Sequence, residues 1–371
     1  MRLSCLTALI ALAIALLPAT AAAERTVPRG WLGVIADGPL TSGGAMDGEW
    51  DLMATDGAES VRTAFYWPSA QRDGSAPPDL AHLDGVVLQA ARRGLPVLPI
   101  VTGTPSWAAG PAGDETSPPR EPRLYADFLR ALVARYGARG SLWAEHPEVA
   151  ARPIRAWQIW NEPNLTRYWT PPRGQGFARS YVKLLRAAHR ALRAADPGAR
   201  TILAGLPNES WIALRQVYKA GGRRAFNAVA LHPYTGRPRN VVRLAEYARR
   251  EMRRFGDGRK PLWITELSWP AAKGKTKNTT GFETTDRGQA SRLTDGLRLL
   301  ARARKRLRIQ RVFWYTWLSR EGSPNSFDYS GLRRVRHGDV ISVPALDAFR
   351  RSARRLQGCA KAPADATRCR S

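Results

Sequence analysis

The feature of this sequence that most restricts its fold is a regular alternation of strand-like and helix-like segments along nearly the whole chain. Short runs rich in β-branched and aromatic residues are typical of strands, and segments with a helical spacing of apolar residues separate them. The expected strands are Trp31–Ala36, Val61–Trp67, Pro96–Thr102, Ala156–Trp160, Thr201–Gly205, Ala228–His232, Pro261–Glu266 and Arg311–Trp317. The expected helices are Gly48–Ala54, Leu80–Arg93, Arg123–Tyr136, Phe177–Ala195, Trp211–Ala220, Asn240–Phe255, Arg287–Leu307 and Pro344–Leu356. Strict alternation predicts parallel strands with helices outside them.

Eight strand–helix units in 371 residues predict an α/β fold of the (β/α)8 TIM-barrel type, built as a single domain. The alternative is an open doubly wound sheet. Such a sheet normally carries a glycine-rich phosphate-binding turn after an early strand, and the sequence has none. We find no internal repeat and no Pro/Gly/Ser-rich linker that would divide the chain.

The first residues have the pattern of a secretory signal peptide. Arg2 precedes the apolar run Leu6–Leu17, and Ala21-Ala22-Ala23 is typical of a cleavage site. We therefore expect residues 1–23 to be a signal peptide and residues 24–371 to form an exported protein, secreted or held in the cell envelope. An uncleaved N-terminal anchor is the alternative, although the apolar run is short for a membrane span.

The cysteines and histidines argue for a disulfide and against a metal. Of three cysteines, Cys5 lies in the leader, whereas Cys359 and Cys369 lie close together near the C-terminus. In an oxidising compartment we expect these two to form a disulfide in a short C-terminal tail. The sequence has no Cys-x-x-Cys pair, and its five histidines have no metal-ligand spacing, so we predict neither a metal nor another cofactor.

The chain is strongly basic, with a net charge of +27. Arginine is distributed over many expected helix faces and is not gathered in one arm, so we favour a solvated surface over nucleic-acid binding. The sequence leaves open whether this positive charge binds an anionic wall polymer or a lipid surface.

Two long loops follow expected strand ends, on the face where barrels carry their active sites. Residues 103–122 are rich in Pro, Gly and Trp, and we expect a lid there because Trp107 gives the loop something to pack. Residues 270–286 carry three lysines and a Thr-rich run, and they favour neither a lid nor disorder.

Two glutamates at strand ends are the strongest candidates for chemistry. Glu162 follows the fourth strand in Trp160-Asn161-Glu162-Pro163, and Glu266 ends the seventh in Thr265-Glu266-Leu267. By strand alternation, Glu266 is expected on the same face as Leu262 and Ile264, two candidate residues of the barrel core. Either glutamate alone could be an ordinary surface carboxylate. In a barrel the two strand ends approach each other, and two carboxylates that face one sugar ring are what cleavage of a glycosidic bond requires.

These residues resemble clan A of the retaining glycoside hydrolases over the whole expected barrel. The resemblance rests on an ordered set of motifs: Arg62 in Ser60-Val61-Arg62-Thr63, Asn161-Glu162-Pro163, His232-Pro233-Tyr234, Glu266, and Trp314 or Trp317 on the last strand. Asn-Glu-Pro alone is a weak tripeptide, whereas the ordered set is fairly specific.

The resemblance implies roles for five of these residues. Glu162 would be the general acid/base and Glu266 the nucleophile. Asn161 would bind the sugar 2-hydroxyl, and Arg62 and Tyr234 would hold Glu266 ionised and oriented. A retaining pair requires the two carboxyl groups to lie about 5–5.5 Å apart. Because Asn161 and Glu162 are adjacent, a bulge or turn that begins at Trp160 must bring both to the site.

The remaining candidates are substrate contacts. His232 is expected either to bind a substrate hydroxyl or to be a satisfied structural histidine. Trp107 and Trp314 are candidate stacking platforms for sugar rings, although core packing is the commoner role of tryptophan. Trp314 and Trp317 have opposite strand parity, so only one is expected to face the lumen, and we prefer Trp314.

The sequence therefore predicts an exported retaining glycoside hydrolase that acts on a β-linked oligo- or polysaccharide. The strong positive charge raises the further hypothesis of an anionic polysaccharide substrate. The alternatives are a catalytically silent carbohydrate-binding barrel of the cell surface and a basic cell-wall scaffold.

Overall fold

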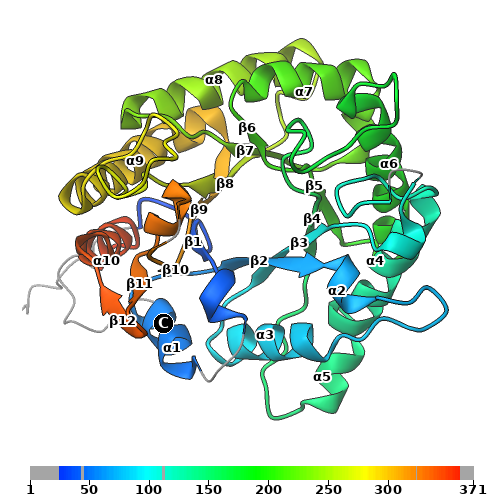
Figure 1. Ribbon diagram of the computed structural model, residues 1–371, viewed down its shortest axis with the longest axis horizontal. Helices are drawn as coiled ribbons and strands as arrows, with labels where there is room; N and C mark the ends of the chain where they lie inside the picture. Colours follow the sequence, from blue (N-terminus) through cyan, green and yellow to red (C-terminus); the bar gives the residue numbers. More distant parts are fainter. Residues whose placement is uncertain (1–24, 43–45, 111–112, 323, 360–371) are drawn as a thin grey trace, which may run out of the picture.

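The computed structural model describes residues 25–42, 46–110, 113–322 and 324–359, and these form a (β/α)8 barrel (Figure 1). The barrel strands form one parallel sheet in the order β5-β4-β3-β2-β1-β9-β8-β7-β6. A bridge between Ile202 and Ala228 joins the end of β5 to the segment that leads into β7, so the sheet closes on itself. β5 and β6 are two pieces of the fifth strand, which gives the eight strands that the sequence predicts.

The strand bounds follow the expected ones to within a few residues. They are β1 (Leu32–Ile35), β2 (Val61–Tyr66), β3 (Val97–Thr102), β4 (Ala156–Ile159), β5 (Arg200–Ile202), β6 (Leu206–Pro207), β7 (Val229–His232), β8 (Leu262–Leu267) and β9 (Ile309–Trp314). Hydrophobic β-branched runs form these strands because a barrel strand is covered on both faces.

Helices surround the barrel as an outer ring (Figure 1). They are α1 (Asp47–Thr55), α2 (Trp67–Ala70), α3 (Ala81–Arg92), α4 (Pro122–Tyr136), α5 (Ser141–Glu145), α6 (Phe177–Ala195), α7 (Ser210–Lys219), α8 (Pro238–Arg254), α9 (Asp286–Leu307) and α10 (Pro344–Leu356). In α6, the stripe that includes Leu184, Leu185 and Ala188 is buried, as its helical spacing predicts. Among the described residues no helix is both long and apolar enough to cross a membrane.

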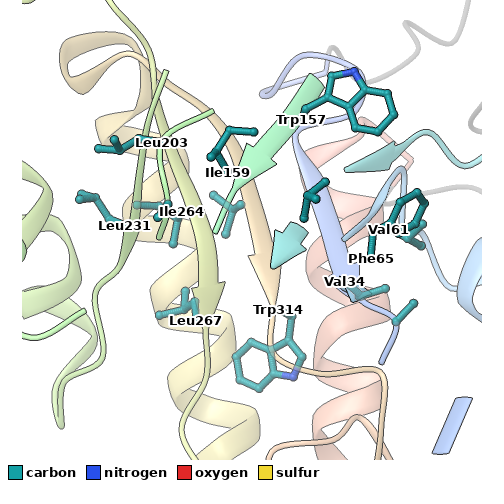
Figure 2. Packing of buried hydrophobic residues seen from close by; sticks show 14 of the residues in the cluster. Val34, Val61, Phe65, Trp157, Ile159, Leu203, Leu231, Ile264, Leu267 and Trp314 are labelled. Carbon is teal, nitrogen blue, oxygen red and sulfur yellow. The ribbon is translucent and has the colours of Figure 1, made fainter. Parts of the chain in front are cut away.

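Two apolar cores lie on the two faces of the strands. The larger one fills the space between strands and helices and includes Val34, Ile264 and Trp314 (Figure 2). The smaller one fills the barrel interior and includes Ile35, Trp263 and Phe313. Neighbouring residues of one strand thus belong to different cores, as strand alternation requires.

A second, three-stranded sheet was not expected from the sequence. It consists of β10 (Leu318–Arg320), β11 (Arg333–Arg336) and β12 (Asp339–Ser342) and lies between β9 and α10. Arg334 is fully buried and donates hydrogen bonds to Asp286, Gln289 and Glu321. Burial opposes ionisation of Glu321, yet its bonds from Arg336 and Arg334 lower its pKa to about 2. Ion pairing therefore explains why an arginine-rich segment can form an inner strand.

Several predictions concern the two ends of the chain. The expected signal peptide, residues 1–23, lies outside the described residues. Cys359 is buried after α10. Its predicted disulfide partner, Cys369, lies outside the described residues, as the signal peptide does. Both assignments stay predictions.

Candidate active site

The carboxyl ends of the barrel strands surround a cleft of about 860 Å³. Glu162, Glu266, Asn161 and Tyr234 all line it. The two long loops predicted beside the site contribute to its wall, residues 103–122 through Glu115 and residues 270–286 through Thr280 and Phe282. Aromatic rings make up much of the remaining wall: Tyr66, Trp160, Tyr168, Tyr315 and Phe327.

Backbone geometry explains how two adjacent residues reach one site. β4 ends at Ile159, and Trp160 and Glu162 then adopt left-handed conformations with φ of 69° and 45°. The Glu162 amide donates a 3.1 Å hydrogen bond to the Gly205 carbonyl, which fixes this turn against the fifth strand. Left-handed conformations are uncommon for residues other than glycine and cluster at functional sites. The turn begins at Trp160, where the sequence predicts it.

Glu266 reaches the cleft for a different reason from the one expected. Leu262 and Ile264 face the helices, so simple alternation would have turned Glu266 outward as well. The pairing of β8 with β9 shifts register between Ile264 and Leu267. This irregularity lets Glu266 line the cleft, which corrects the expectation that it shares a face with Ile264.

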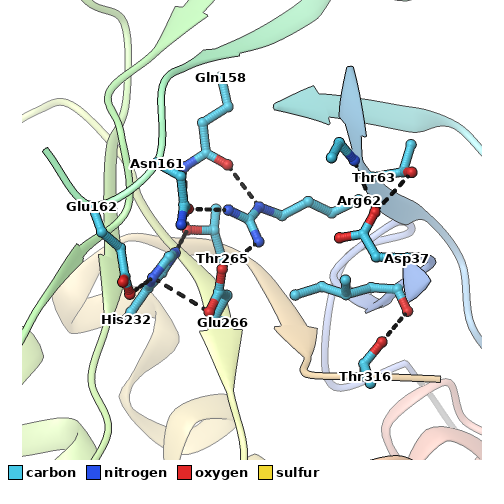
Figure 3. A network of polar contacts seen from close by, with 12 residues as sticks. Asp37, Arg62, Thr63, Gln158, Asn161, Glu162, His232, Thr265, Glu266 and Thr316 are labelled. Carbon is cyan, nitrogen blue, oxygen red and sulfur yellow. Dashed lines mark hydrogen bonds and ion pairs between the residues drawn. The ribbon is translucent and has the colours of Figure 1, made fainter. Parts of the chain in front are cut away.

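Donors hold Glu266 on both of its oxygens, and Figure 3 shows the contact with Arg62. Arg62 Nη1 lies 2.8 Å from Oε1, and the Tyr234 hydroxyl donates to Oε2 at 2.6 Å. Burial raises the pKa of this carboxyl, but the charges of His232 and Arg62 and the hydrogen bonds from Tyr234 and Arg62 together lower it below its ordinary value of 4.5. Glu266 is therefore ionised at neutral pH. Burial also raises the pKa of Tyr234 well above its ordinary range, so the phenol keeps the proton that it donates.

Arg62 links Glu266 to the residues at the end of β4. Its side chain is fully buried and also donates to Gln158 Oε1 at 2.7 Å and to Asn161 Oδ1 at 2.9 Å. The guanidinium therefore orients the Asn161 amide as well as Glu266 (Figure 3). A planar fork of donors suits this task, which the compact ammonium of lysine could not perform.

His232 lies between the two glutamates. Its Nδ1 is 2.7 Å from Glu162 Oε1 and 3.5 Å from Glu266 Oε2, and its Nε2 is 3.0 Å from the Thr265 hydroxyl. The ring is fully buried, and it is not part of the cleft wall. The assignment of His232 as a substrate contact is therefore corrected to its alternative, a structural histidine that holds the carboxylates in place.

Gly205 makes room for this histidine. A Cβ atom at position 205 would lie 1.8 Å from His232 Nε2, which no small adjustment can relieve. We expect Gly205→Ala to displace His232, to cost about 1–3 kcal/mol of stability and to impair the site. Thermal unfolding and kinetics of the purified variant test this. Gly85→Ala is the matched control, since a Cβ there meets nothing within 4 Å in α3 and alanine favours the helix. Equal effects of the two substitutions would contradict the assigned role.

The two tryptophans predicted as sugar platforms do not line the cleft. Trp314 is buried between the strands and the helices and donates to the Ser330 carbonyl at 3.1 Å. Trp107 packs edge-on against Trp67 and donates to the Gln71 carbonyl, so it anchors its loop. These two assignments are corrected. Tyr315, one residue beyond Trp314, has the opposite parity and faces the cleft.

Two polar residues of the site were not predicted from the sequence. Asp37 follows β1 and lines the cleft, where it accepts hydrogen bonds from the Thr63 hydroxyl and the Ala64 amide. Burial raises its pKa despite these bonds. Arg167, on the rim, lies 3.6 Å from Glu162 Oε2. A polar residue directly after a buried strand was the signal for Asp37, whereas nothing local marks Arg167.

The cluster has a geometry that a divalent cation could also use. Glu162, His232 and Glu266 each offer a ligand atom, and these atoms lie within 4.8 Å of one another. However, each oxygen of Glu266 already accepts a hydrogen bond, from Arg62 or from Tyr234. A fixed guanidinium charge 2.8 Å away opposes cation binding, so the arrangement suits an ionised nucleophile better than a metal ligand.

Solved structures share this architecture. A family 39 glycoside hydrolase from Bacteroides cellulosilyticus WH2 superimposes with a TM-score of 0.66 at 18% identity, over 88% of this chain and 64% of that one. A GH39 β-xylosidase from Caulobacter crescentus gives 0.64 at 20% identity, over 88% and 72%. A GH5_18 protein from Streptomyces cattleya gives 0.61 at 18% identity, over 90% and 81%. The described residues therefore have the barrel fold of these glycoside hydrolases. The resemblance predicted from the motifs is thus confirmed at the level of the fold.

Similarity in sequence covers less of the chain than similarity in structure. A β-xylosidase from Geobacillus stearothermophilus is 26% identical over 140 residues, which cover 34% of this chain. The matched region covers 25% of that relative's length. No protein-family model matches the chain.

Proposed function

We propose that this protein is a retaining glycoside hydrolase that cleaves a β-linked glycosidic bond, with Glu266 as nucleophile and Glu162 as general acid/base. One observation carries the proposal: one carboxylate oxygen of Glu162 and one of Glu266 lie within 4.8 Å of each other, and both residues line the cleft. Retaining enzymes keep their carboxyl groups about 5–5.5 Å apart, whereas inverting enzymes leave about 6.5–9.5 Å for a water molecule.

The environment of Glu266 supports the role of nucleophile. Attack requires the ionised form, and the lowered pKa supplies it at neutral pH. Arg62 and Tyr234 fix the carboxylate without covering it, since each of its oxygens has a second lone pair. Asn161, oriented by Arg62, is available to the sugar 2-hydroxyl, where a hydrogen bond strengthens as the transition state forms.

The reaction then proceeds in two balanced steps. In the first, a Glu266 oxygen bonds to the anomeric carbon, the glycosidic C–O bond breaks, and Glu162 gives its proton to the departing oxygen. In the second, water attacks the same carbon, Glu162 takes the proton of that water, and the bond to Glu266 breaks. Two inversions give net retention, and no cofactor takes part.

The cleft wall and the similar proteins support a substrate of β-linked sugars. Flat aromatic rings in this wall, Tyr66, Tyr168 and Tyr315 among them, suit the C–H faces of sugar rings. The similar sequence from Geobacillus stearothermophilus and the similar structure from Caulobacter crescentus are both described as β-xylosidases. A Streptomyces cattleya GH5_18 variant was solved with Manb1-4GlcNAc. We infer an oligo- or polysaccharide substrate of this kind.

We further propose that the protein is exported and acts outside the cytoplasm. The support is the signal-peptide pattern of residues 1–23 and the cysteine pair near the C-terminus. The net charge of +27 would attract an anionic wall polymer in the envelope.

A panel of 4-nitrophenyl β-glycosides, assayed with the purified chain lacking residues 1–23, tests the proposal. We expect saturable release of 4-nitrophenol from at least one member of the panel. Saturable binding of a glycan without turnover would instead support a silent carbohydrate-binding barrel. The absence of both would contradict a saccharide function.

A further inference from the structure

A second hollow, of about 370 Å³, adjoins the catalytic cleft between α7 and α8. Asn208 and Tyr234 line both cavities, so the two are adjacent. The other wall residues come from the first turn of α7, the loop before α8, and α8 itself: Trp211, Thr235, Asn240, Arg243, Leu244 and Tyr247. None of these last residues belongs to the catalytic machinery described above.

The hollow adjoins the part of the fifth strand that contacts the turn of Glu162. The acid/base must reach the leaving oxygen, so the aglycone lies on the Glu162 side. Asn161 bridges to Gly205, and Asn208 follows only a few residues later, beyond β6. Asn208 has a left-handed backbone with φ of 52°, which turns the chain from the cleft into α7. A leaving chain that extends past Glu162 toward Asn208 would reach this hollow.

The walls have the composition of a sugar-binding subsite. Trp211 is half-buried and makes an edge-to-face contact with Tyr247, with ring centroids 4.9 Å apart. An indole held in this way presents a flat apolar surface at little entropic cost. Asn240 and Thr235, which share a hydrogen bond of 3.4 Å, add polar groups that can fix hydroxyls.

Arg243 gives the hollow a positive charge. Its Nε donates to the Tyr247 hydroxyl at 2.9 Å, and its two terminal amino groups form no hydrogen bond within the described part of the chain. Among the described residues no carboxylate forms an ion pair with it, while Glu246, the nearest acid on α8, pairs with Arg306. A guanidinium without an acidic partner, beside an aromatic platform, matches a sugar that carries a carboxylate.

We propose that this hollow is a leaving-group-side subsite for an acidic sugar residue, with the ring on Trp211 and the carboxylate on Arg243. The inference rests on the proposed glycosidase function and adds to it a substrate class, β-linked chains that contain uronic acid. It also assigns a specific place to the attraction for anionic glycans that the overall charge suggests.

A binding experiment tests this inference independently of catalysis. The Glu266→Gln protein would be titrated by calorimetry with a xylo-oligosaccharide that bears a glucuronic acid branch, and with the unbranched neutral chain of the same length. We expect tighter binding of the acidic chain, by about tenfold. Adding Arg243→Gln should remove most of that preference, and Trp211→Ala should weaken both ligands.

Two controls address charge and folding. Arg190→Gln removes the same charge from an exposed position on α6 and should leave the preference intact. Arg243→Lys keeps the charge but loses the fork, so it should restore part of the preference. An unchanged preference in a folded Arg243→Gln protein, or no preference in the parent, would overturn the inference. Failure of the wild-type chain to hydrolyse any glycoside would overturn the proposed function instead and would leave these binding results valid.

Discussion

Glu266→Gln is expected to lower kcat/KM for the best aryl β-glycoside by about 10⁴-fold or more, because the amide cannot form the covalent intermediate. The substitution is nearly isosteric and keeps an oxygen to accept from Arg62 or Tyr234. Steady-state kinetics at neutral pH measure the loss, and thermal unfolding checks that the variant is folded.

Chemical rescue distinguishes a nucleophile from a merely structural carboxylate. In Glu266→Ala, added azide can enter the vacated space and attack the anomeric carbon of an activated glycoside. The product should be a glycosyl azide of inverted configuration, since only one displacement occurs. A residual activity near that of the wild type, or a rescue product with retained configuration, would show that Glu266 is not the nucleophile.

Glu162→Gln is expected to have an effect that depends on the leaving group. An alkyl glycoside or oligosaccharide needs a proton on its departing oxygen, so kcat/KM should fall by about 10²–10⁴-fold. A 2,4-dinitrophenyl glycoside departs without protonation, so its kcat/KM should fall far less. A comparison of kcat/KM across aryl glycosides of graded leaving-group acidity measures the difference.

Glu115→Gln is the matched control for this series. Glu115 also lines the cleft, but it pairs with the Tyr66 hydroxyl and lies on the loop after β3. Its variant should show no added dependence on the leaving group. If Glu115→Gln and not Glu162→Gln produced that dependence, the acid/base would have to be reassigned.

Tyr234→Phe should move the acid limb of the activity profile to higher pH. Activity falls as pH falls through the pKa of Glu266, because the protonated carboxyl cannot attack. In the wild type that pKa lies below 4.5, partly through the bond from Tyr234. Removing the donor raises the pKa. The pH dependence of kcat/KM tests this, with Tyr66→Phe, which removes a phenol away from Glu266, as control. An unshifted limb in Tyr234→Phe would contradict the proposed support of the nucleophile.

The barrel was predictable from sequence because its signals are local and repeated. The bounds of α6 and α10 agree with the predicted ones, since apolar periodicity and flanking Pro or Gly mark both helices. The sheet of β10, β11 and β12 escaped prediction because its stability comes from ion pairs of Arg334 with residues distant in sequence. Charged strands carry no hydrophobic alternation that a sequence pattern could reveal.

The site was predictable in its residue types but not in its details. Motif order identified Arg62, Glu162 and Glu266, and the structure brings these three together. Strand alternation placed Glu266 on the same face as Ile264, and this was wrong because β8 shifts register where it pairs with β9. The burial of His232 likewise depends on Gly205, which lies on a neighbouring strand end. Such features arise from contacts between strands, and alternation within one strand does not encode them.

The most direct test of the central claim is the anomeric configuration of the first product. Proton NMR would follow hydrolysis of an active β-glycoside from the first minutes, before mutarotation mixes the anomers. The close approach of Glu162 and Glu266 predicts that the β-anomer appears first and the α-anomer only later. Initial release of the α-anomer would contradict a double displacement and with it the assignment of Glu266 as nucleophile.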